Sequence, residues 1–264
     1  METDASYWQH IAERYRGGQH MDPALAEHTR QVNLELVRRW APMLANPRIL
    51  KTDAFAEAAC PARAFAWDVH EGAQLVTIDI APGFSPRGKQ NAVSKGHRGT
   101  SYAVADVRYI PFTDDSFDLV LSDSTLDHFH TADEIRVALR ELARVLKPGG
   151  ILIIALDNPQ NVTDPLFQLW LRRGKPPFFI GETLSRKQLV QSLENLGLQA
   201  TDTTAMFHYP RFFTKAVLRL MRRMAPGRCD DWARRMLQAL NGLERCRTRY
   251  LTGLYVAARA VKPS

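Results

Sequence analysis

Cysteine is scarce in this chain of 264 residues, which contains Cys60, Cys229 and Cys246. An odd number of cysteines without metal-ligand spacing argues against a disulfide framework and against a metal site, and it fits a reducing compartment. No apolar run approaches the length of about 18 residues that a membrane-spanning helix needs. The N-terminus lacks the apolar segment of a signal peptide. We therefore expect a cytoplasmic protein without a transmembrane helix.

Several functional motifs are also missing. No G-x-G-x-x-G follows the first predicted strand, which weighs against a nicotinamide oxidoreductase, and no Ser-His-Asp arrangement stands out. The net charge of +7 comes from residues 201–250, which contain eleven Lys and Arg but four Asp and Glu. The rest of the chain has equal numbers of basic and acidic residues. This basic region lacks the interleaved aromatic residues of a nucleic-acid module, so nucleic acid is not the expected partner.

The most informative stretch is present between residues 103 and 157. Apolar runs at 103–106, 117–122 and 151–156 predict three strands, and the segment between the second and third predicts a helix. Thr131 and Glu134 form a capping box at its start, and Pro148 with Gly149 ends it. Continuous apolar strands joined by an amphipathic helix are typical of a parallel sheet covered on both faces.

The remaining chain continues this alternation. We predict helices at 5–17, 23–45, 54–71, 185–196, 211–225 and 230–246, strands at 48–52, 74–80, 198–209 and 252–261, and a long loop at 82–100. The fold class is α/β, a Rossmann-like, doubly wound, mostly parallel sheet of seven strands with an antiparallel last strand. We expect a single domain over 1–264, with N-terminal helices in 1–45 and a helical insertion at 211–246 before the last strand.

Acids and turns recur in a specific order along this fold. Asp79 ends the second strand, Asp106 ends the third, residues 114–120 enter the fourth, and Leu146–Gly150 turn into the fifth. In this order and spacing the chain resembles the class I S-adenosylmethionine-dependent methyltransferases, especially the small-molecule branch. The resemblance covers roughly residues 45–200 and the final strand. It implies a transferase that methylates a small or lipid-like molecule.

The resemblance also implies a cofactor, S-adenosyl-L-methionine, and its contacts. In the family, an acid such as Asp79 holds the ribose hydroxyls and an acid such as Asp106 accepts from the adenine amine. Carboxylates suit both roles because charge-assisted hydrogen bonds are strong. The implied cofactor-binding residues are Thr52, Asp53, Asp79, Ile80, Asp106, Val107 and Ser122.

The first motif departs from the family. Lys51 replaces the usual acid after the first strand, and Asp53, Phe55 and Glu57 stand where the family has glycines. Either the loop takes a different path and still binds the cofactor, with Asp53 paired to its amino group, or Phe55 fills the site and binding is lost. The second interpretation leads to an alternative function, a non-catalytic protein of this fold that binds a partner or regulates an active enzyme.

The segment after the fourth strand lies at the cofactor–substrate junction in the family. Histidine suits proton transfer at neutral pH, so His128 is the first catalytic candidate and Asp123 the second, ahead of His130 and His208. A packing role for His128 is the alternative. Many methyltransferases need no base, because positioning the two reactants in line suffices.

The helix predicted at 211–225 is strongly amphipathic. Its apolar face holds Phe213, Ala216, Val217, Leu220, Met221 and Met224, and Arg and Lys fall largely on the other side. One interpretation is peripheral contact with an anionic membrane. The other is a helix packed on the domain with a solvated basic face. An amphiphilic or acidic substrate beneath this helix is a further alternative.

Overall fold

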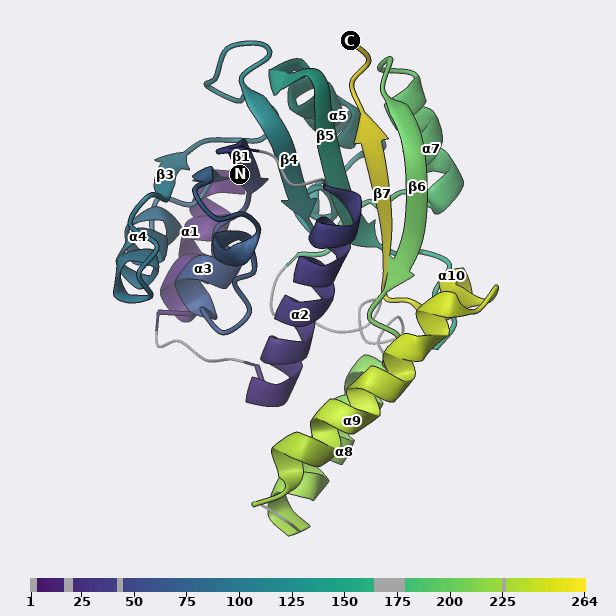
Figure 1. The fold of residues 1–264 in the computed structure, drawn as a ribbon. Helices are drawn as coiled ribbons and strands as arrows, with labels where there is room; N and C mark the ends of the chain where they lie inside the picture. Colours follow the sequence, from purple (N-terminus) through teal and green to yellow (C-terminus); the bar gives the residue numbers. More distant parts are fainter. Residues whose placement is uncertain (1–3, 17–20, 42–44, 164–178, 225–226) are drawn as a thin grey trace.

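The computed structural model describes residues 4–16, 21–41, 45–163, 179–224 and 227–264. These residues form a seven-stranded sheet in the order β3-β2-β1-β4-β5-β7-β6 (Figure 1). The strands are β1 (Arg48–Thr52), β2 (Gln74–Asp79), β3 (Ser101–Val104), β4 (Phe117–Asp123), β5 (Leu146–Asp157), β6 (Gln199–Met206) and β7 (Tyr255–Val261). Neighbours from β3 to β5 are parallel, and β7 is antiparallel to both β5 and β6. The predicted fold class is confirmed.

Helices cover both faces of the sheet. The first face packs against α2 (Pro23–Trp40) and α9 (Cys229–Asn241), and the second against α5 (Ala132–Val145) and α7 (Arg186–Glu194). A third apolar cluster joins α1 (Asp4–Arg14), α3 (Phe55–Ala59) and α4 (Phe84–Ser94), which lie toward the β3 edge in Figure 1. The remaining helices are α8 (Arg211–Met224) and α10 (Arg249–Thr252), with 3-10 turns η1 (Ala66–Asp68), η2 (Leu126–His128) and η3 (Gly242–Arg245).

The helix α5 forms as its sequence predicts. The Thr131 hydroxyl accepts from the Glu134 N–H while the Glu134 carboxylate accepts from the Thr131 N–H, which completes the capping box. One face of the helix is fully buried against the apolar strands β4 and β5. This packing helps to hold in place the segment 124–131, which connects the carboxyl end of β4 to α5.

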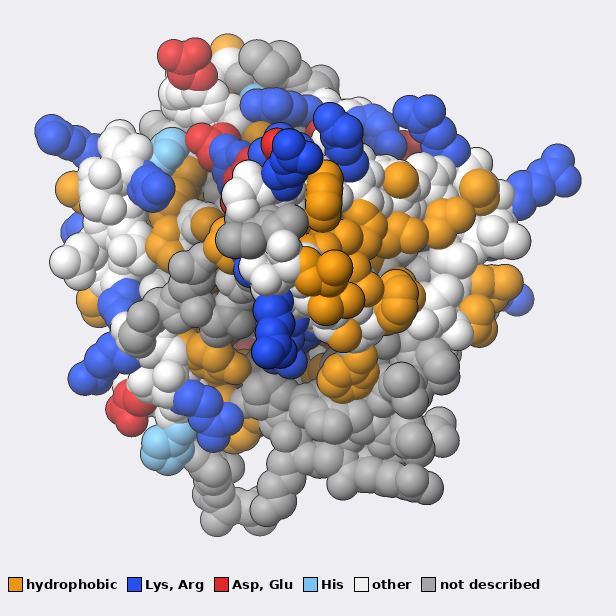
Figure 2. Space-filling view, turned by 90° about the horizontal axis from the view of Figure 1, so that it is seen from below, with side chains coloured by type: hydrophobic (Ala, Val, Ile, Leu, Met, Phe, Trp, Pro, Cys, Tyr) orange, Lys and Arg blue, Asp and Glu red, His pale blue; other side chains and the backbone are white. Residues whose placement is uncertain are grey.

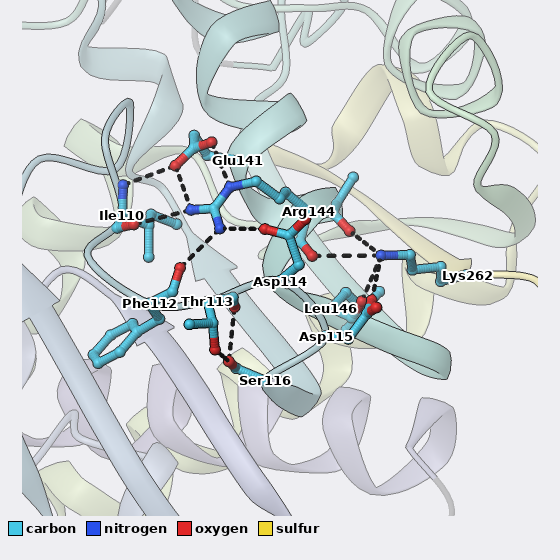
Figure 3. A network of polar contacts seen from close by, with 11 residues as sticks. Ile110, Phe112, Thr113, Asp114, Asp115, Ser116, Glu141, Arg144, Leu146 and Lys262 are labelled. Atoms are coloured by element: carbon cyan, nitrogen blue, oxygen red, sulfur yellow. Dashed lines mark hydrogen bonds and ion pairs between the residues drawn. The ribbon is translucent and has the colours of Figure 1, made fainter.

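The turn before β4 is held by two cations (Figure 3). Arg144 donates to the Asp114 carboxylate at 2.8 Å and to the carbonyls of Ile110 and Phe112. Lys262, from the end of β7, donates to the Asp115 carboxylate at 2.8 Å and to the carbonyls of residues 143, 144 and 146. The acids of residues 114–115 therefore stabilise the amino end of β4, opposite the edge where ligands of such sheets bind.

The long loop predicted at 82–100 is wrong, because residues 84–94 form helix α4. Phe84 and Ala92 are buried in apolar clusters, so tertiary packing outweighs the weak helix preference of this segment. Gly88 lies inside this helix, although glycine in a sequence favours a loop over a helix. A Cβ at this position would lie 2.6 Å from the Tyr102 ring, so this glycine permits close packing of helix against strand.

Helix α8 of the insertion between β6 and β7 has an unexpected orientation. Its apolar residues Phe213, Leu220 and Met224 are 66%, 56% and 73% exposed, whereas its basic residues largely face a cavity or form ion pairs. Lys215, Arg219 and Arg223 are exposed, as expected for a packed helix with a solvated basic face, but the predicted apolar face is exposed as well. Viewed from the side from which α8 and α9 project, hydrophobic side chains gather in a broad patch bordered by Lys and Arg (Figure 2).

Candidate active site

A cavity of about 860 Å³ lies where the parallel strands end. Its walls come from the segments after β1 to β5 and from helices α1, α2 and α8. Ligands of doubly wound sheets bind at this edge, and ligand cavities usually measure about 300–1,000 Å³. We call the part lined by Asp53, Asp79 and Asp106 the acidic end. The part lined by Arg63, Arg211, Lys215 and Arg219 is the basic end.

Asp79 lies where the sequence predicts it, at the end of β2 and on the cavity wall. Its carboxylate accepts from the backbone N–H groups of Ala54 and Ala81, both at 2.8 Å. Burial and the nearby Asp53 carboxylate raise the pKa of Asp79 to about 7, against the lowering effect of those hydrogen bonds. The carboxylate is thus fixed in position with lone pairs left for a ligand.

Asp106 also lines the cavity, two residues beyond β3. Arg108 grips its carboxylate through three contacts of 2.6 to 3.1 Å. The same guanidinium binds Asp4 of α1 at 2.7 Å and Glu134 of α5 at 2.6 Å. Arg108 therefore fixes the Asp106 carboxylate and ties the first helix to the acidic end.

The loop after β1 keeps the cavity open. Asp53 has a φ of 78°, which explains why the family uses glycine here, and Asp is among the few residues that tolerate it. The Asp53 carboxylate accepts from the Phe55 N–H at 2.5 Å. The Phe55 ring contacts Tyr15 and Phe84 edge-on, and Asp53, Phe55, Asp79 and Asp106 all line one cavity. This geometry favours the interpretation in which the loop still binds a cofactor.

Lys51 and Glu57 point away from the cavity and pair inside the protein. The Lys51 Nζ lies 3.2 Å from Glu57 Oε2 and donates to the Asp53 carbonyl at 2.6 Å, and the two side chains are 2% and 0% exposed. Neither is among the described residues that line the cavity. The two departures from the family motif therefore compensate each other as an internal ion pair.

The other predicted cofactor contacts divide into two groups. Thr52, Ile80 and Val107 line the cavity with the three acids. Ser122 is buried, and among the described residues it is not part of the cavity wall. Its hydroxyl accepts from Thr52 Oγ1 at 3.1 Å, and Thr52 also bonds Thr125 at 2.8 Å. Ser122 thus orients the threonine that faces the ligand.

The two catalytic candidates occupy different positions. His128 lines the cavity, its Nδ1 lies 2.7 Å from the Phe179 carbonyl, and its ring packs against Trp8. Asp123 is not among the described cavity-lining residues, and burial raises the pKa of its carboxyl. It accepts from Asn33 Nδ2 at 3.1 Å. The position of His128 would allow it to contact a ligand. Asp123 is better placed to hold neighbouring side chains such as Asn33 in position.

Neither lower-ranked histidine lines the cavity within the described residues. His208 is buried and bonded to Thr252 and to the Ala205 carbonyl, which is a structural role. The described residues contain no cluster of three groups suited to a metal ion.

The cavity also contains residues that the sequence does not predict as site residues. Ser124 has a φ of 53°, and its hydroxyl lies 2.9 Å from the Asp127 carboxylate and 3.5 Å from the Tyr255 hydroxyl. Burial raises the pKa of Asp127 to about 6. Arg63 also lines the cavity, from the turn that Pro61 introduces. A strained residue directly after β4 is a signal of function that only the backbone reveals.

Known proteins of the methyltransferase fold resemble this chain in sequence and in structure. Residues 57–154 match a family model described as a methyltransferase domain. The chain has a TM-score of 0.62 and 20% identity to the chain solved in complex with the Haloferax volcanii Trm112 methyltransferase activator, with 99% and 98% of the two chains covered. It also matches the [4+2]-cyclase SpnF, with a TM-score of 0.59 and 21% identity over 88% and 80% of the chains. The predicted resemblance to class I methyltransferases is confirmed.

Curated relatives are similar in sequence over a shorter span. The ubiquinone/menaquinone biosynthesis C-methyltransferase UbiE of Teredinibacter turnerae is 36% identical over 37% of this chain. Human mitochondrial 2-methoxy-6-polyprenyl-1,4-benzoquinol methylase is 36% identical over 48% of this chain. The chain spans about two fifths of the length of these relatives, 39% and 40% respectively.

Proposed function

We propose that this chain is an S-adenosylmethionine-dependent methyltransferase that acts on a small, lipid-like molecule. One observation carries the proposal: Asp79 and Asp106 face the same cavity as His128 in the segment after β4. The two carboxylates can accept from ribose hydroxyls and from an adenine amine. The segment after β4 then borders both the acidic and the basic end.

The acidic end fits the cofactor. Ile80 and Val107 supply apolar walls beside the two acids, and Asp53 supplies a carboxylate for an amino group. S-adenosylmethionine, when bound, supplies a methyl group on a positively charged sulfonium. The chain itself positions the acceptor, and exclusion of water and alignment of the two reactants account for most of the rate.

Calorimetry with S-adenosylmethionine and S-adenosylhomocysteine tests the proposal. We expect saturable binding to the wild-type chain and a loss of at least about tenfold in affinity for Asp79→Ala, since it removes hydrogen bonds to a charged group. Asp202→Ala, at a half-exposed position of β6 outside the cavity, is the matched control. No binding of either compound at millimolar concentration would falsify the proposal.

The proposed acceptor is a quinol-like ring with an apolar tail. One relative is named as a C-methyltransferase of ubiquinone/menaquinone biosynthesis and another as a polyprenyl-benzoquinol methylase. The cavity has apolar walls that include Leu25, Phe207 and Leu218. Incubation of the chain with labelled S-adenosylmethionine and a short-chain demethylated quinol should give a product methylated on ring carbon. Mass spectrometry identifies the methylated atom, and transfer to none of a panel of prenylated quinols would exclude this acceptor class.

The non-catalytic alternative depended on a blocked cofactor site, and the open cavity beside Phe55 does not support it. Turnover by the purified chain without any partner excludes a purely regulatory role. Binding of the cofactor without turnover, restored by a second protein, would instead favour that role.

We also propose that α8 contacts an anionic membrane surface. No helix among the described residues is long and apolar enough to cross a bilayer, but Phe213, Leu220 and Met224 form an exposed apolar stripe. An amphipathic helix of this kind can bury its apolar side chains at the boundary between headgroups and acyl chains. A lipid-like acceptor could then pass from the bilayer to the basic end of the cavity.

Sedimentation with vesicles of equal parts phosphatidylcholine and phosphatidylglycerol tests this contact. The variant Leu220→Glu with Met224→Glu should stay in the supernatant, while Val93→Glu, at an exposed apolar position of α4, should sediment like the wild type. Arg222 is a poor choice for this test because it pairs with Asp22 and Asp230. Equal sedimentation of all three proteins contradicts membrane contact through α8.

A further inference from the structure

Arg63 is a cation in the cavity wall. Its side chain is 20% exposed, and within the described part of the chain its Nε is buried without a hydrogen-bond partner. The carboxylate within ion-pair range is that of Asp123, at 4.0 Å. The backbone N–H of Arg63 is fixed by the Cys60 carbonyl at 2.8 Å, so the side chain starts from a defined turn.

The neighbouring carboxylate does not satisfy this guanidinium. Asp123 accepts from Asn33 at 3.1 Å, and 4.0 Å is too long for a hydrogen bond to Arg63. A guanidinium carries five N–H donors, and donors shielded from water without partners cost free energy. An acceptor atom supplied by a ligand would remove that cost.

The position of Arg63 matters as much as its charge. Its charge interacts with Asp53 at the acidic end and with Tyr209 and Tyr255 beside the basic end. The neighbouring cation Arg211 is already bound to the Asp157 carboxylate at 2.5 Å. Arg63 thus belongs to the basic end but is within charge range of Asp53 at the acidic end, so an anion bound to it would lie close to both ends.

We propose that Arg63 binds an oxyanion of the acceptor molecule, which makes the substrate an anionic amphiphile. This inference rests on the proposed function and specifies its substrate class. Two sources of the oxyanion share this chemistry: an ionised ring hydroxyl and a ring carboxylate. A carboxylate matches the guanidinium fork with two parallel bonds. An ionised hydroxyl also gains electron density, which makes it and its neighbouring ring carbons better nucleophiles.

Three probes with the same ring and tail separate these sources. They are para-hexylbenzoate, para-hexyl-ortho-nitrophenol, whose ionised form absorbs visible light, and the neutral para-hexylbenzyl alcohol. We expect the full-length chain to bind at least one anionic probe about tenfold or more tightly than the alcohol. Preference for the benzoate identifies a carboxylate. A fall of about one unit or more in the pKa of the bound nitrophenol identifies an ionised hydroxyl.

Variants assign the effect to Arg63. Arg63→Met should abolish the preference for anions, and Arg63→Lys should retain part of it. Arg234→Met, at an exposed position of α9 outside the cavity, should leave it unchanged. No anion preference in the wild type, or the same preference in Arg63→Met, overturns the proposal.

A second variant covers the case in which Arg63→Met fails to fold. Asp123→Asn removes the carboxylate near Arg63 and should tighten anionic probes several-fold without affecting the alcohol. Unchanged binding of the anions by this variant also overturns the proposal. These measurements need no cofactor, so a chain that binds anions through Arg63 but not S-adenosylmethionine would refute the proposed function alone.

Discussion

Lys51 and Glu57 place two opposite charges inside the protein, directly beneath the loop that borders the acidic end. Burial raises the pKa of the Glu57 carboxyl. For Lys51, burial lowers the pKa, but the nearby carboxylates of Glu57, Asp53 and Asp123 have the larger combined effect, so the pKa of Lys51 is raised. Within the described part of the chain, Glu57 Oε1 has no hydrogen-bond partner. Such a pair is sensitive to loss of either member, because the remaining charge is then buried alone.

Glu57→Gln should lower the free energy of unfolding by about 3–5 kcal/mol, since it removes the buried carboxylate that balances the charge of the Lys51 ammonium. The double variant Lys51→Met with Glu57→Met should recover most of this loss, because no buried charge remains. Urea denaturation measures both. Asp133→Asn, which breaks an exposed ion pair with Arg136, is the control and should change stability by less than about 1 kcal/mol. Equal stability of Glu57→Gln and wild type would contradict this account.

If the proposed role of Asp79 is correct, its carboxyl should make cofactor binding dependent on pH. Its folded pKa of about 7 lies above the ordinary value of 3.8, so the folded state holds the proton more tightly. The contribution to stability is therefore fully present below about pH 4 and declines as the pH rises to about 7. Ribose hydroxyls bind best to the ionised carboxylate, so cofactor affinity should change in the opposite direction.

Affinity for S-adenosylhomocysteine should rise between pH 6 and pH 8 as Asp79 loses its proton, given its pKa of about 7. Asp79→Asn should bind more weakly and with little dependence on pH over the same range. Calorimetry in buffers of matched ionic strength measures both. A wild-type profile as flat as that of Asp79→Asn is incompatible with this role.

At the scale of single elements, the local sequence pattern predicts a helix or strand correctly where tertiary packing favours the same structure. The capping box of α5 and the strands β4 and β5 are confirmed. In each case the local sequence and the burial of its apolar residues favour the same structure. Helix α4 was missed because Gly88 indicates a loop in sequence, whereas it permits contact with Tyr102 in the structure. The orientation of α8 was also missed, since amphipathicity defines two faces without saying which one meets the protein.

A substitution of Arg144 tests whether this residue stabilises the turn before β4. Arg144→Met removes bonds to Asp114, Glu141 and two carbonyls, and it should lower the free energy of unfolding by about 1–3 kcal/mol. Thermal denaturation should show the loss, while cofactor affinity stays unchanged because the turn lies opposite the cavity. Arg136→Met, on the exposed face of the same helix, is the control.

At the scale of the whole molecule, one cavity joins parts of the chain that are far apart in sequence. The acidic end was largely predictable, because Asp79 and Asp106 follow strands whose ends must meet at one edge. The basic end was not. Arg63 and Tyr255 belong to elements that become neighbours only when β7 inserts between β5 and β6, and single-sequence patterns carry no signal of that proximity.

Binding should therefore stabilise the entire fold. A ligand that contacts α1, the strand ends and the segment after β4 binds the folded state alone. S-adenosylhomocysteine at 100 times its dissociation constant should raise the free energy of unfolding by about 2.7 kcal/mol. Thermal denaturation with increasing ligand should show a matching rise in Tm for the wild type and a smaller one for Asp79→Ala.

The inward pairing of Lys51 with Glu57 also restricts how this chain can evolve. An acid at position 51 would place a second buried carboxylate close to Glu57, and a glycine at position 57 would leave the buried ammonium without its counter-charge. Either single replacement passes through a destabilised protein, and both together bring these two positions to the family's residue types while Asp53 and Phe55 still differ from it. The two positions are therefore expected to change together among descendants of this sequence, and the pair is a marker by which its lineage can be traced.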